Sequence, residues 1–317
     1  MTGHSAAPRA RGVEARPIAL TIGVFDGLHR GHRRIIEETV AAARAIEGAA
    51  WAATFDPHPD SVVRGIEDRP WITPPEERKA LLHALGIDRV EVVRFDHAVQ
   101  SLLPEDFLDR VLGVGAPLRA LVIGPDFRMG KNRVGDRGYL ESLGTRRGFT
   151  VREVPFLLTD GVKLSSTMLR KEIEAGRLEE AAMVLGRPYA LEGTVGSGSG
   201  RGTGLGYPTA NLEIAPQKLL PAAGIYLSDN ELEGARHPGV TYVGSAGTFG
   251  PGPVRVEVHL MDFDGSLRGR SVRTLLIRRL RADKVFDSPQ ALVEAMDQDL
   301  VEARAWWERA GRMAGRA

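Results

Sequence analysis

The stretch ALTIGVFDGLHRGH, residues 19–32, contains a short apolar run, a glycine turn and two histidines. The apolar run predicts a β-strand over residues 18–22, because its residue types favour strands. After the turn, apolar residues recur at helical spacing up to Ile46, which predicts a helix beginning near His29. A strand, a turn and a helix are therefore expected in that order, with His29 and His32 at the start of the helix.

Strand-like and helix-like segments alternate through the rest of the first half. We expect strands in residues 51–59, 89–95 and 119–124, and helices in residues 73–86, 105–115, 165–176 and 177–186. Strands that alternate with helices are typical of a parallel sheet covered by helices. The first half is therefore predicted to be an α/β domain.

The pattern changes near residue 187. Short strands are expected in residues 189–195, 224–229, 239–245, 254–263 and 273–280, and a last helix in residues 288–309. Short strands separated by turns favour a β-barrel. The fold class is thus α/β plus β, with a disordered tail over residues 1–16, an α/β domain over 17–186 and a β domain over 187–317.

The composition narrows the class of protein. The 317 residues include no cysteine, which excludes disulfides and thiolate metal sites and fits a reducing compartment such as the cytoplasm. The 42 basic and 41 acidic residues nearly cancel, so no basic field argues for nucleic acid as a partner. No apolar run approaches the length of a membrane span, and the first residues lack the apolar core of a signal peptide.

The histidine pair suits phosphate. A helix N-terminus offers unpaired N–H groups and the positive end of the helix dipole. Imidazoles one turn apart at that position can donate hydrogen bonds to a polyphosphate and stabilise charge that develops during its transfer. The plain alternative is two surface histidines, but the preceding strand places the pair at the carboxyl edge of the sheet, where ligands bind. Zinc is disfavoured because no third ligand has metal-like spacing.

A second phosphate-suited helix start lies in LSSTMLR, residues 164–170. Ser165, Ser166 and Thr167 open a predicted helix, and Arg170 follows about one turn later. Hydroxyls and a guanidinium at a helix start can clamp phosphate. The alternative is an ordinary Ser/Thr cap with a solvated arginine, but two such helix starts in one domain favour the functional interpretation.

The second half carries two further candidate features. The glycine-rich stretch GSGSGRGTGLGYPTANLEI, residues 196–214, resembles a flexible linker until it reaches Thr209 and Asn211, whose oxygens suit a phosphate–magnesium site. In VRVEVHLMDFDG, residues 254–265, alternation places Glu257 opposite the apolar row of the strand. Glu257 is therefore a candidate general base, and the alternative is an ordinary solvent-facing glutamate.

The motifs of the first half resemble the HxGH nucleotidyltransferases and, more specifically, the bacterial bifunctional riboflavin kinase/FAD synthetases. The shared segments are GVFDGLHRGH, FDPHP at residues 55–59, GPDFRMG at 124–130 and LSSTMLR. The resemblance implies a Rossmann-like FMN adenylyltransferase domain. It implies flavin binding by His58, Asp126 and Phe127, catalysis by His29 and His32, and ATP binding by Gly23, Phe25, Asp26, His29, His32, Ser165, Ser166, Thr167 and Arg170.

The motifs of the second half resemble the riboflavin kinase domain of the same family. The shared segments are LGYPTANL at residues 205–212 and EVHLMDF at 257–263. The resemblance implies a six-stranded Greek-key barrel with a terminal helix, in which Glu257 activates the ribityl hydroxyl and Thr209 and Asn211 hold Mg²⁺. It also implies nucleotide binding by Gly198, Gly200, Arg201, Gly202, Thr209 and Asn211.

Taken together, the resemblance implies that ATP phosphorylates riboflavin to FMN and that AMP then passes from ATP to FMN, giving FAD and pyrophosphate. Two departures concern the first step: residues 246–249 read AGTF without the family's proline, and Arg268 stands where the family has tyrosine. Two alternatives stay open. The chain could be an FMN adenylyltransferase whose barrel only binds flavin, or a flavin-sensing protein without turnover. The sequence leaves homo-oligomerisation open.

Overall fold

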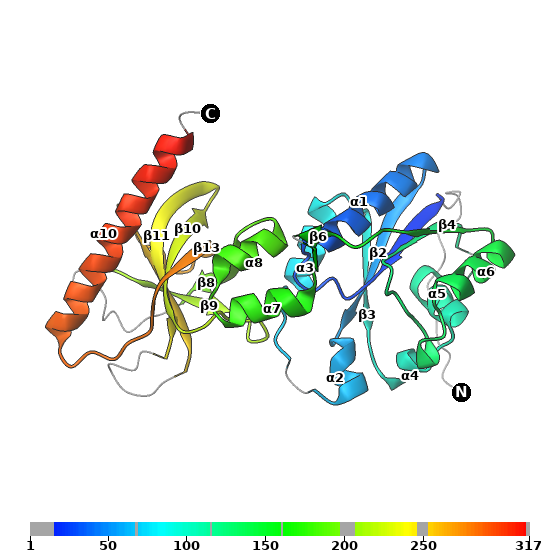
Figure 1. Ribbon diagram of the computed structural model, residues 1–317, viewed down its shortest axis with the longest axis horizontal. Helices are drawn as coiled ribbons and strands as arrows, with labels where there is room; N and C mark the ends of the chain where they lie inside the picture. Colours follow the sequence, from blue (N-terminus) through cyan, green and yellow to red (C-terminus); the bar gives the residue numbers. More distant parts are fainter. Residues whose placement is uncertain are drawn as a thin grey trace, which may run out of the picture. The chain divides into compact units, whose positions relative to one another are not determined.

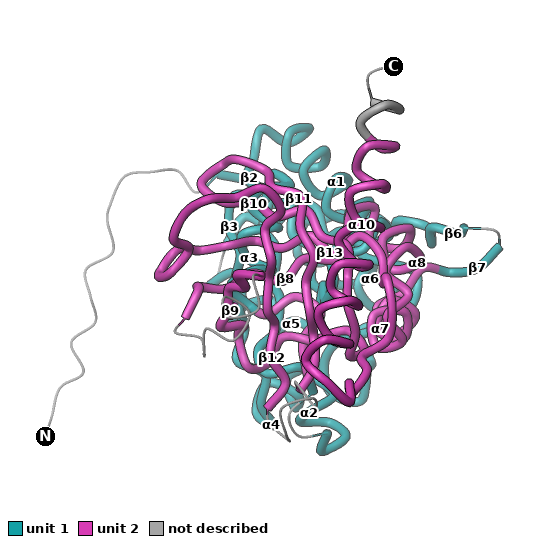
Figure 2. The backbone as a smooth tube through the Cα atoms, turned by 90° about the vertical axis from the view of Figure 1, so that its left-hand side faces the viewer, with its two compact units in different colours: residues 1–69, 75–163 teal, residues 70–74, 164–317 magenta. Residues whose placement is uncertain are grey.

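The computed structural model describes residues 16–66, 69–114, 116–159, 161–196, 207–245 and 253–314. These residues form two compact units, coloured separately in Figure 2. The first unit contains the described residues among 1–69 and 75–163, and the second contains those among 70–74 and 164–317. Each unit has its own sheet.

The first unit is built on a five-stranded parallel sheet in the order β3-β2-β1-β4-β5 (Figure 1). Its strands are β1 (Ile18–Ile22), β2 (Ala49–Asp56), β3 (Arg89–Arg94), β4 (Leu118–Ile123) and β5 (Thr150–Glu153). All five residues of β1 are buried, as expected for the central strand of a parallel sheet. The strand order reverses between β1 and β4, and open α/β sheets bind ligands at the carboxyl ends of such a pair.

Helices and short elements connect these strands. They are α1 (Arg30–Ala45), α2 (Pro59–Arg64), α3 (Pro75–Ala84), α4 (His97–Gln100), α5 (Pro104–Leu112), the 3-10 helix η1 (Lys131–Arg133), α6 (Arg137–Arg147) and the hairpin β6 (Leu158–Thr159) and β7 (Val162–Lys163). Apolar residues of α1 and α3, such as Ile36 and Leu82, pack against one face of the sheet. Ala50 of β2 and Val122 of β4 belong to that face. The opposite sheet face packs against α5 and α6. The unit therefore has three layers, with an apolar core on each face of the sheet.

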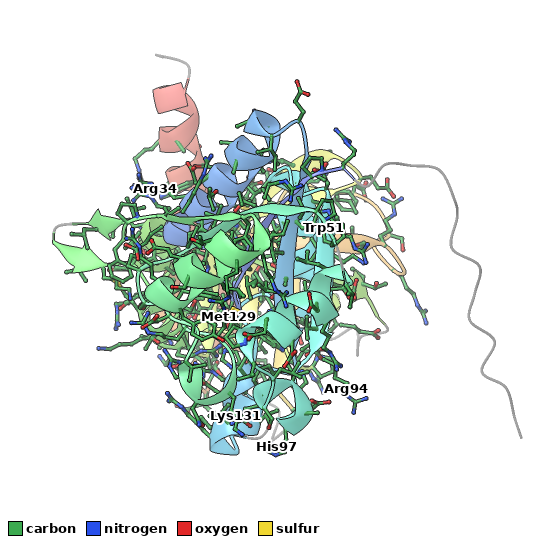
Figure 3. The ribbon with its side chains drawn as sticks, turned by 90° about the vertical axis from the view of Figure 1, so that its right-hand side faces the viewer. Arg34, Trp51, Arg94, His97, Met129 and Lys131 are labelled. Carbon is green, nitrogen blue, oxygen red and sulfur yellow. The ribbon has the colours of Figure 1, made fainter. Side chains whose placement is uncertain are left out.

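The segment after β4 lies at the carboxyl edge of this sheet. In Figure 3, Lys131 lies on the same side of the unit as Arg94, which ends β3, and away from Trp51 near the start of β2. The loops that follow β1, β2 and β4, which carry most of the predicted adenylyltransferase residues, therefore leave the sheet at one edge.

The second unit contains a closed antiparallel barrel in the order β10-β11-β12-β9-β8-β13. Its strands are β8 (Tyr189–Val195), β9 (Ala210–Ile214), β10 (Gly224–Leu232), β11 (Ala235–Gly244), β12 (Arg255–Leu260) and β13 (Ser271–Ala282). Residues Val256, Val258 and Leu260 of β12 are buried, whereas Glu257 and His259 are partly exposed on the other face. The alternation predicted for this strand is confirmed.

Among the residues that the structure describes, the helices that accompany the barrel are α7 (Ser166–Glu174), α8 (Leu178–Leu185) and α10 (Pro289–Ala314). Helix α10 packs Leu300 and Ala303 against Leu227 and Val240 of the barrel. The Asp299 carboxylate of α10 accepts hydrogen bonds from Arg281 of β13 at 2.9 and 2.8 Å. One face of the barrel, the face that carries Glu257, is therefore covered by a helix.

The predicted α/β sheet and six-stranded barrel are confirmed, but the compact units do not divide at residues 186 and 187. They divide at residues 163 and 164, because α8 packs against β8 and β13 and α7 packs against α8. Residues 70–74 also join the second unit, since the Trp71 N–H donates to Gln217 at 2.6 Å. The predicted disordered tail lies outside the described residues except for Arg16.

Candidate active sites

The turn between β1 and α1 has an unusual backbone. Phe25, Gly27 and Leu28 have φ values of 52°, 85° and 43°, and Gly27 supplies the conformation that side chains resist most. Phe25 and Asp26 are buried, with 2% of each exposed. The Thr54 hydroxyl of β2 donates to the Val24 carbonyl at 2.9 Å, which ties the turn to the neighbouring strand. The turn is therefore rigidly held by its packing.

His29 is the N-cap of α1. Its Nδ1 accepts a hydrogen bond from the His32 backbone N–H at 3.3 Å, and the two imidazole rings stack with centroids 3.7 Å apart and planes 20° apart. An Nδ1 that accepts carries no proton, so the proton of a neutral His29 sits on Nε2. His29 can thus cap the helix with one nitrogen and donate to a ligand with the other.

His32 is held in the neutral form. Burial lowers its pKa well below the usual 6.5, and the neighbouring His29 lowers the pKa further. The Nδ1 atom of His32 is buried without a hydrogen-bond partner among the described residues, so a proton placed there would have no acceptor. His32 can therefore act on phosphate as a neutral hydrogen-bond donor rather than as a cation.

His58 follows β2 and is the N-cap of the short helix α2. Its Nδ1 accepts from the Asp60 N–H at 3.0 Å, and 12% of its side chain is exposed. The predicted flavin residue is thus oriented by the same device that orients His29.

Asp126 and Phe127 follow β4, the neighbour of β1. The Asp126 carboxylate is 69% exposed and forms an ion pair with the Lys163 ammonium at 2.6 Å. The Lys163 ammonium also lies 3.8 Å from the centroid of the Phe156 ring. The structure therefore places Asp126 and His29 after adjacent strands of the same sheet.

Ser165, Ser166, Thr167 and Arg170 lie at the N-terminus of α7, in the second unit. Ser165 is the N-cap, because its hydroxyl accepts from the Met168 N–H at 3.2 Å. This is the ordinary capping role that the sequence left open for it. The role of all four residues as a clamp on the phosphates held by His29 and His32 stays a prediction.

In the barrel, Thr209, Asn211 and Glu257 lie close together. Strands β9 and β12 pair so that Asn211 stands directly opposite Glu257. The Thr209 hydroxyl, which precedes β9, donates to the Glu257 carboxylate at 3.2 Å. Two segments 46 or more residues apart in sequence thereby bring a carboxylate, a hydroxyl and an amide to one face of the barrel.

Thr209 lines two cavities. One, of about 290 Å³, is lined by Gly196, Thr209, Asn211 and Arg268 among others. The other, of about 60 Å³, is lined by Thr209, Glu257, His259, Tyr242 and residues of α10. The altered residue Arg268 therefore lies beside the cavity of Thr209 and Asn211, not beside that of Glu257. Gly198, Gly200, Arg201, Gly202 and the altered turn 246–249 lie outside the described residues.

The donor set fits magnesium that arrives with a nucleotide. Among the described residues, no group of three or more His, Cys, Asp or Glu side chains could hold a metal ion. Thr209, Asn211 and Glu257 offer oxygen atoms, which Mg²⁺ prefers, but only one carboxylate. Such a set suits an ion whose remaining ligands are phosphate oxygens and water.

Sequence reasoning missed one buried charged residue in the first unit. Arg78 of α3 is fully buried, and its guanidinium donates to the Phe55 carbonyl at the end of β2 at 2.7 Å. The available signal was helical spacing, since Arg78 lies one turn before the buried Leu82 and so on the apolar face.

Comparisons with known proteins match both units. Residues 13–168 match the FAD synthetase family, and residues 185–307 match the riboflavin kinase family. The bifunctional riboflavin kinase/FMN adenylyltransferase of Pseudomonas fluorescens is 34% identical over 95% of each chain. The protein of the same name from Escherichia coli strain K12 is 31% identical over 91% of this chain and 92% of that one.

A solved structure shares the fold. The crystal structure of a macrolide-efflux protein from Streptococcus pneumoniae covers 93% of this chain and 96% of that chain, with a TM-score of 0.82 and 28% identity. Of this chain's described helices, none has the length and apolar character that crossing a membrane requires. The two family matches, the paired sites and the full-length relatives agree, and the chain belongs to the bifunctional riboflavin kinase/FMN adenylyltransferase family.

Proposed function

We propose that this chain phosphorylates riboflavin to FMN at the barrel and transfers AMP from ATP to FMN at the parallel sheet. The observation that carries the proposal is the presence of two separate phosphate-suited sites, one in each unit. The first is the histidine-capped start of α1, and the second is the Thr209–Glu257 pair between two cavities. A protein that only senses flavin has no need for a carboxylate base oriented by a hydroxyl that lines two cavities.

In adenylyl transfer, the FMN phosphate oxygen attacks the α-phosphorus of ATP, and pyrophosphate leaves. Little covalent chemistry is required of the protein, so positioning and charge stabilisation carry the step. The Nε2–H of His29 and the ring of His32 bind phosphate oxygens, and the N–H groups of α1 add the helix dipole. His58 and Asp126 leave the same sheet edge and are proposed to contact the flavin or its phosphate, and Phe127 the flavin ring.

In the kinase step, the ribityl hydroxyl of riboflavin attacks the γ-phosphorus of ATP, and ADP leaves. Glu257 accepts the hydroxyl proton as the new O–P bond forms. Thr209 keeps the carboxylate oriented, since its hydroxyl donates to Glu257 at 3.2 Å. Thr209 and Asn211 are the side chains that would hold Mg²⁺, which neutralises phosphate charge when bound.

The composition bears on where the enzyme works. The absence of cysteine supports a cytoplasmic location. Small molecules are the proposed partners: riboflavin, FMN and ATP as substrates, with FAD as a product.

The test of the proposed function is flavin analysis after incubation with riboflavin, ATP and Mg²⁺. We expect FAD, with FMN as an intermediate. FAD formed from added FMN but not from riboflavin would mean that the barrel only binds flavin. Recovery of unchanged riboflavin and FMN in both assays would contradict both activities and favour a flavin sensor.

Glu257→Gln tests the general base. Glutamine keeps the size and reach of the side chain but cannot accept the proton, so the kinase kcat should fall by roughly 10²–10⁴-fold with little change in riboflavin Kd. Both quantities should be measured on one preparation, with adenylylation of added FMN as the internal control. A fall in kcat below about fivefold, well short of the range for a general base, would remove Glu257 from the mechanism.

The neutral state of His32 predicts a pH-dependent stability. A histidine of the unfolded chain titrates near 6.5, and the folded pKa lies well below it. Between these two pKa values only the unfolded chain binds the proton. The free energy of unfolding is therefore highest above about pH 6.5, and the contribution of His32 to it is lost as the pH falls.

The Tm of the first unit should therefore fall less between about pH 7.5 and about pH 5.5 in His32→Gln than in the unaltered protein. The difference should correspond to about 1.4 kcal/mol at most, or roughly 3–6 °C, measured by scanning calorimetry. The control is His97→Gln, which removes an exposed imidazole from the same unit. An equal fall in Tm for His32→Gln and the unaltered protein would show that His32 is not held neutral.

A further inference from the structure

Arg78 is a buried cation between the two loops that carry the adenylyltransfer residues. It lies on α3 with none of its surface exposed. Its guanidinium donates to the Phe55 carbonyl at 2.7 Å, at the point where β2 ends and the loop to His58 begins. A buried arginine is rare unless it is paired, so its position calls for a reason.

Two carboxylates act on this guanidinium. Burial lowers the pKa of Arg78 to about 10, while the charges of Asp26 and then Asp56 raise it. At neutral pH the group therefore remains a cation. Asp26 belongs to the turn after β1, and Asp56 ends β2. Arg78 thus contacts the end of β2 and acts through its charge on the turn after β1.

Asp26 creates an electrostatic problem for that site. Its side chain is buried, with 2% of the residue exposed, and it stands three residues before His29. A buried carboxylate without a counter-charge would repel the triphosphate of ATP strongly, because the low dielectric of the interior screens little. A cation held beside Asp26 removes this repulsion and keeps the turn in place.

We propose that Arg78 is a positioning residue for adenylyl transfer, which neutralises Asp26 and fixes the end of β2 so that the phosphate site tolerates ATP. The inference rests on the proposed function of the first unit. Arg78 acts through Asp26 and the β2 loop and is not a catalytic residue. Its loss should therefore appear first in the affinity for ATP.

Arg78→Met removes the charge and keeps an unbranched side chain of similar reach. We expect the KM for ATP in FMN adenylylation to rise at least about tenfold, since the buried Asp26 carboxylate then lacks the charge of Arg78 and repels the phosphates. Arg78→Lys keeps the charge and should recover most of the affinity. The matched control is Lys79→Met on the same helix, which removes an exposed cation and should leave KM unchanged.

The full-length chain supplies the controls for folding. Riboflavin phosphorylation by the barrel should be normal in every variant, and calorimetry should show a folded first unit. A merely structural role would lower Tm and the active fraction, and hence kcat, without raising the KM for ATP. An unchanged KM in a folded Arg78→Met variant, or no recovery in Arg78→Lys, would overturn the proposal.

A double-mutant cycle decides the question even if Arg78→Met does not fold. In Asp26→Asn the carboxylate is already absent, so adding Arg78→Met should raise the KM for ATP by less than about fivefold, which is the part that acts through the β2 loop. Removing both charges also avoids an uncompensated buried ion. A further rise of more than about fivefold in this background would contradict action through Asp26. If the unaltered chain makes no FAD from FMN, the proposed function fails rather than this inference.

Discussion

The capping of α1 by His29 is the interaction on which the first unit's chemistry depends. One nitrogen of a buried imidazole accepts the His32 N–H, and the two rings stack at 3.7 Å. This arrangement fixes where both rings lie and which nitrogen of His29 carries the proton. Protonation of His32 also costs free energy in this arrangement, because burial and the neighbouring His29 both lower the pKa of His32. The proposed site therefore stabilises phosphate by oriented hydrogen bonds and the helix dipole rather than by a charged His32.

In the second unit, the register of paired strands places the side chains of the proposed site. The pairing of β9 with β12 places Asn211 opposite Glu257, and the residue two positions before Asn211 donates to the Glu257 carboxylate. A slip of β9 by one residue would turn Thr209 and Asn211 to the face of the barrel opposite Glu257. The strand pairing sets the geometry of this site. The two activities proposed here thus depend on different kinds of local structure within one chain.

Sequence patterns predicted the elements with strong periodicity. The buried strand β1, helix α1 and the alternating strand β12 all lie where apolar spacing placed them. Strand β9 was not predicted from its pattern, because the glycine stretch before it and the short run ANLEI give little alternation. Helix α6 and strand β5 were also missed, since α6 buries only Leu140, Leu143 and Gly144 and β5 is four residues long. The division of the units could not be read from the chain either, because it depends on the packing of α8 against the barrel.

The roles that the motifs imply for the site residues stay predictions, and the structure adds their contacts. His29 caps α1, and Thr209 and Asn211 lie beside Glu257. The buried partner of Asp26 could not be anticipated, because Arg78 approaches the turn only through tertiary packing. The state of the histidines was also left open by the sequence, since it depends on burial and on the hydrogen bond between them.

The most direct test of two independent sites is flavin product analysis on the full-length His29→Ala/His32→Ala variant. The variant is incubated with riboflavin, ATP and Mg²⁺, and the flavins are separated by chromatography. If the two sites are independent, we expect FMN to accumulate at the rate of the unaltered protein while FAD formation is lost. FAD formation at the unaltered rate, or loss of FMN formation in a variant that calorimetry shows to be folded, would contradict it.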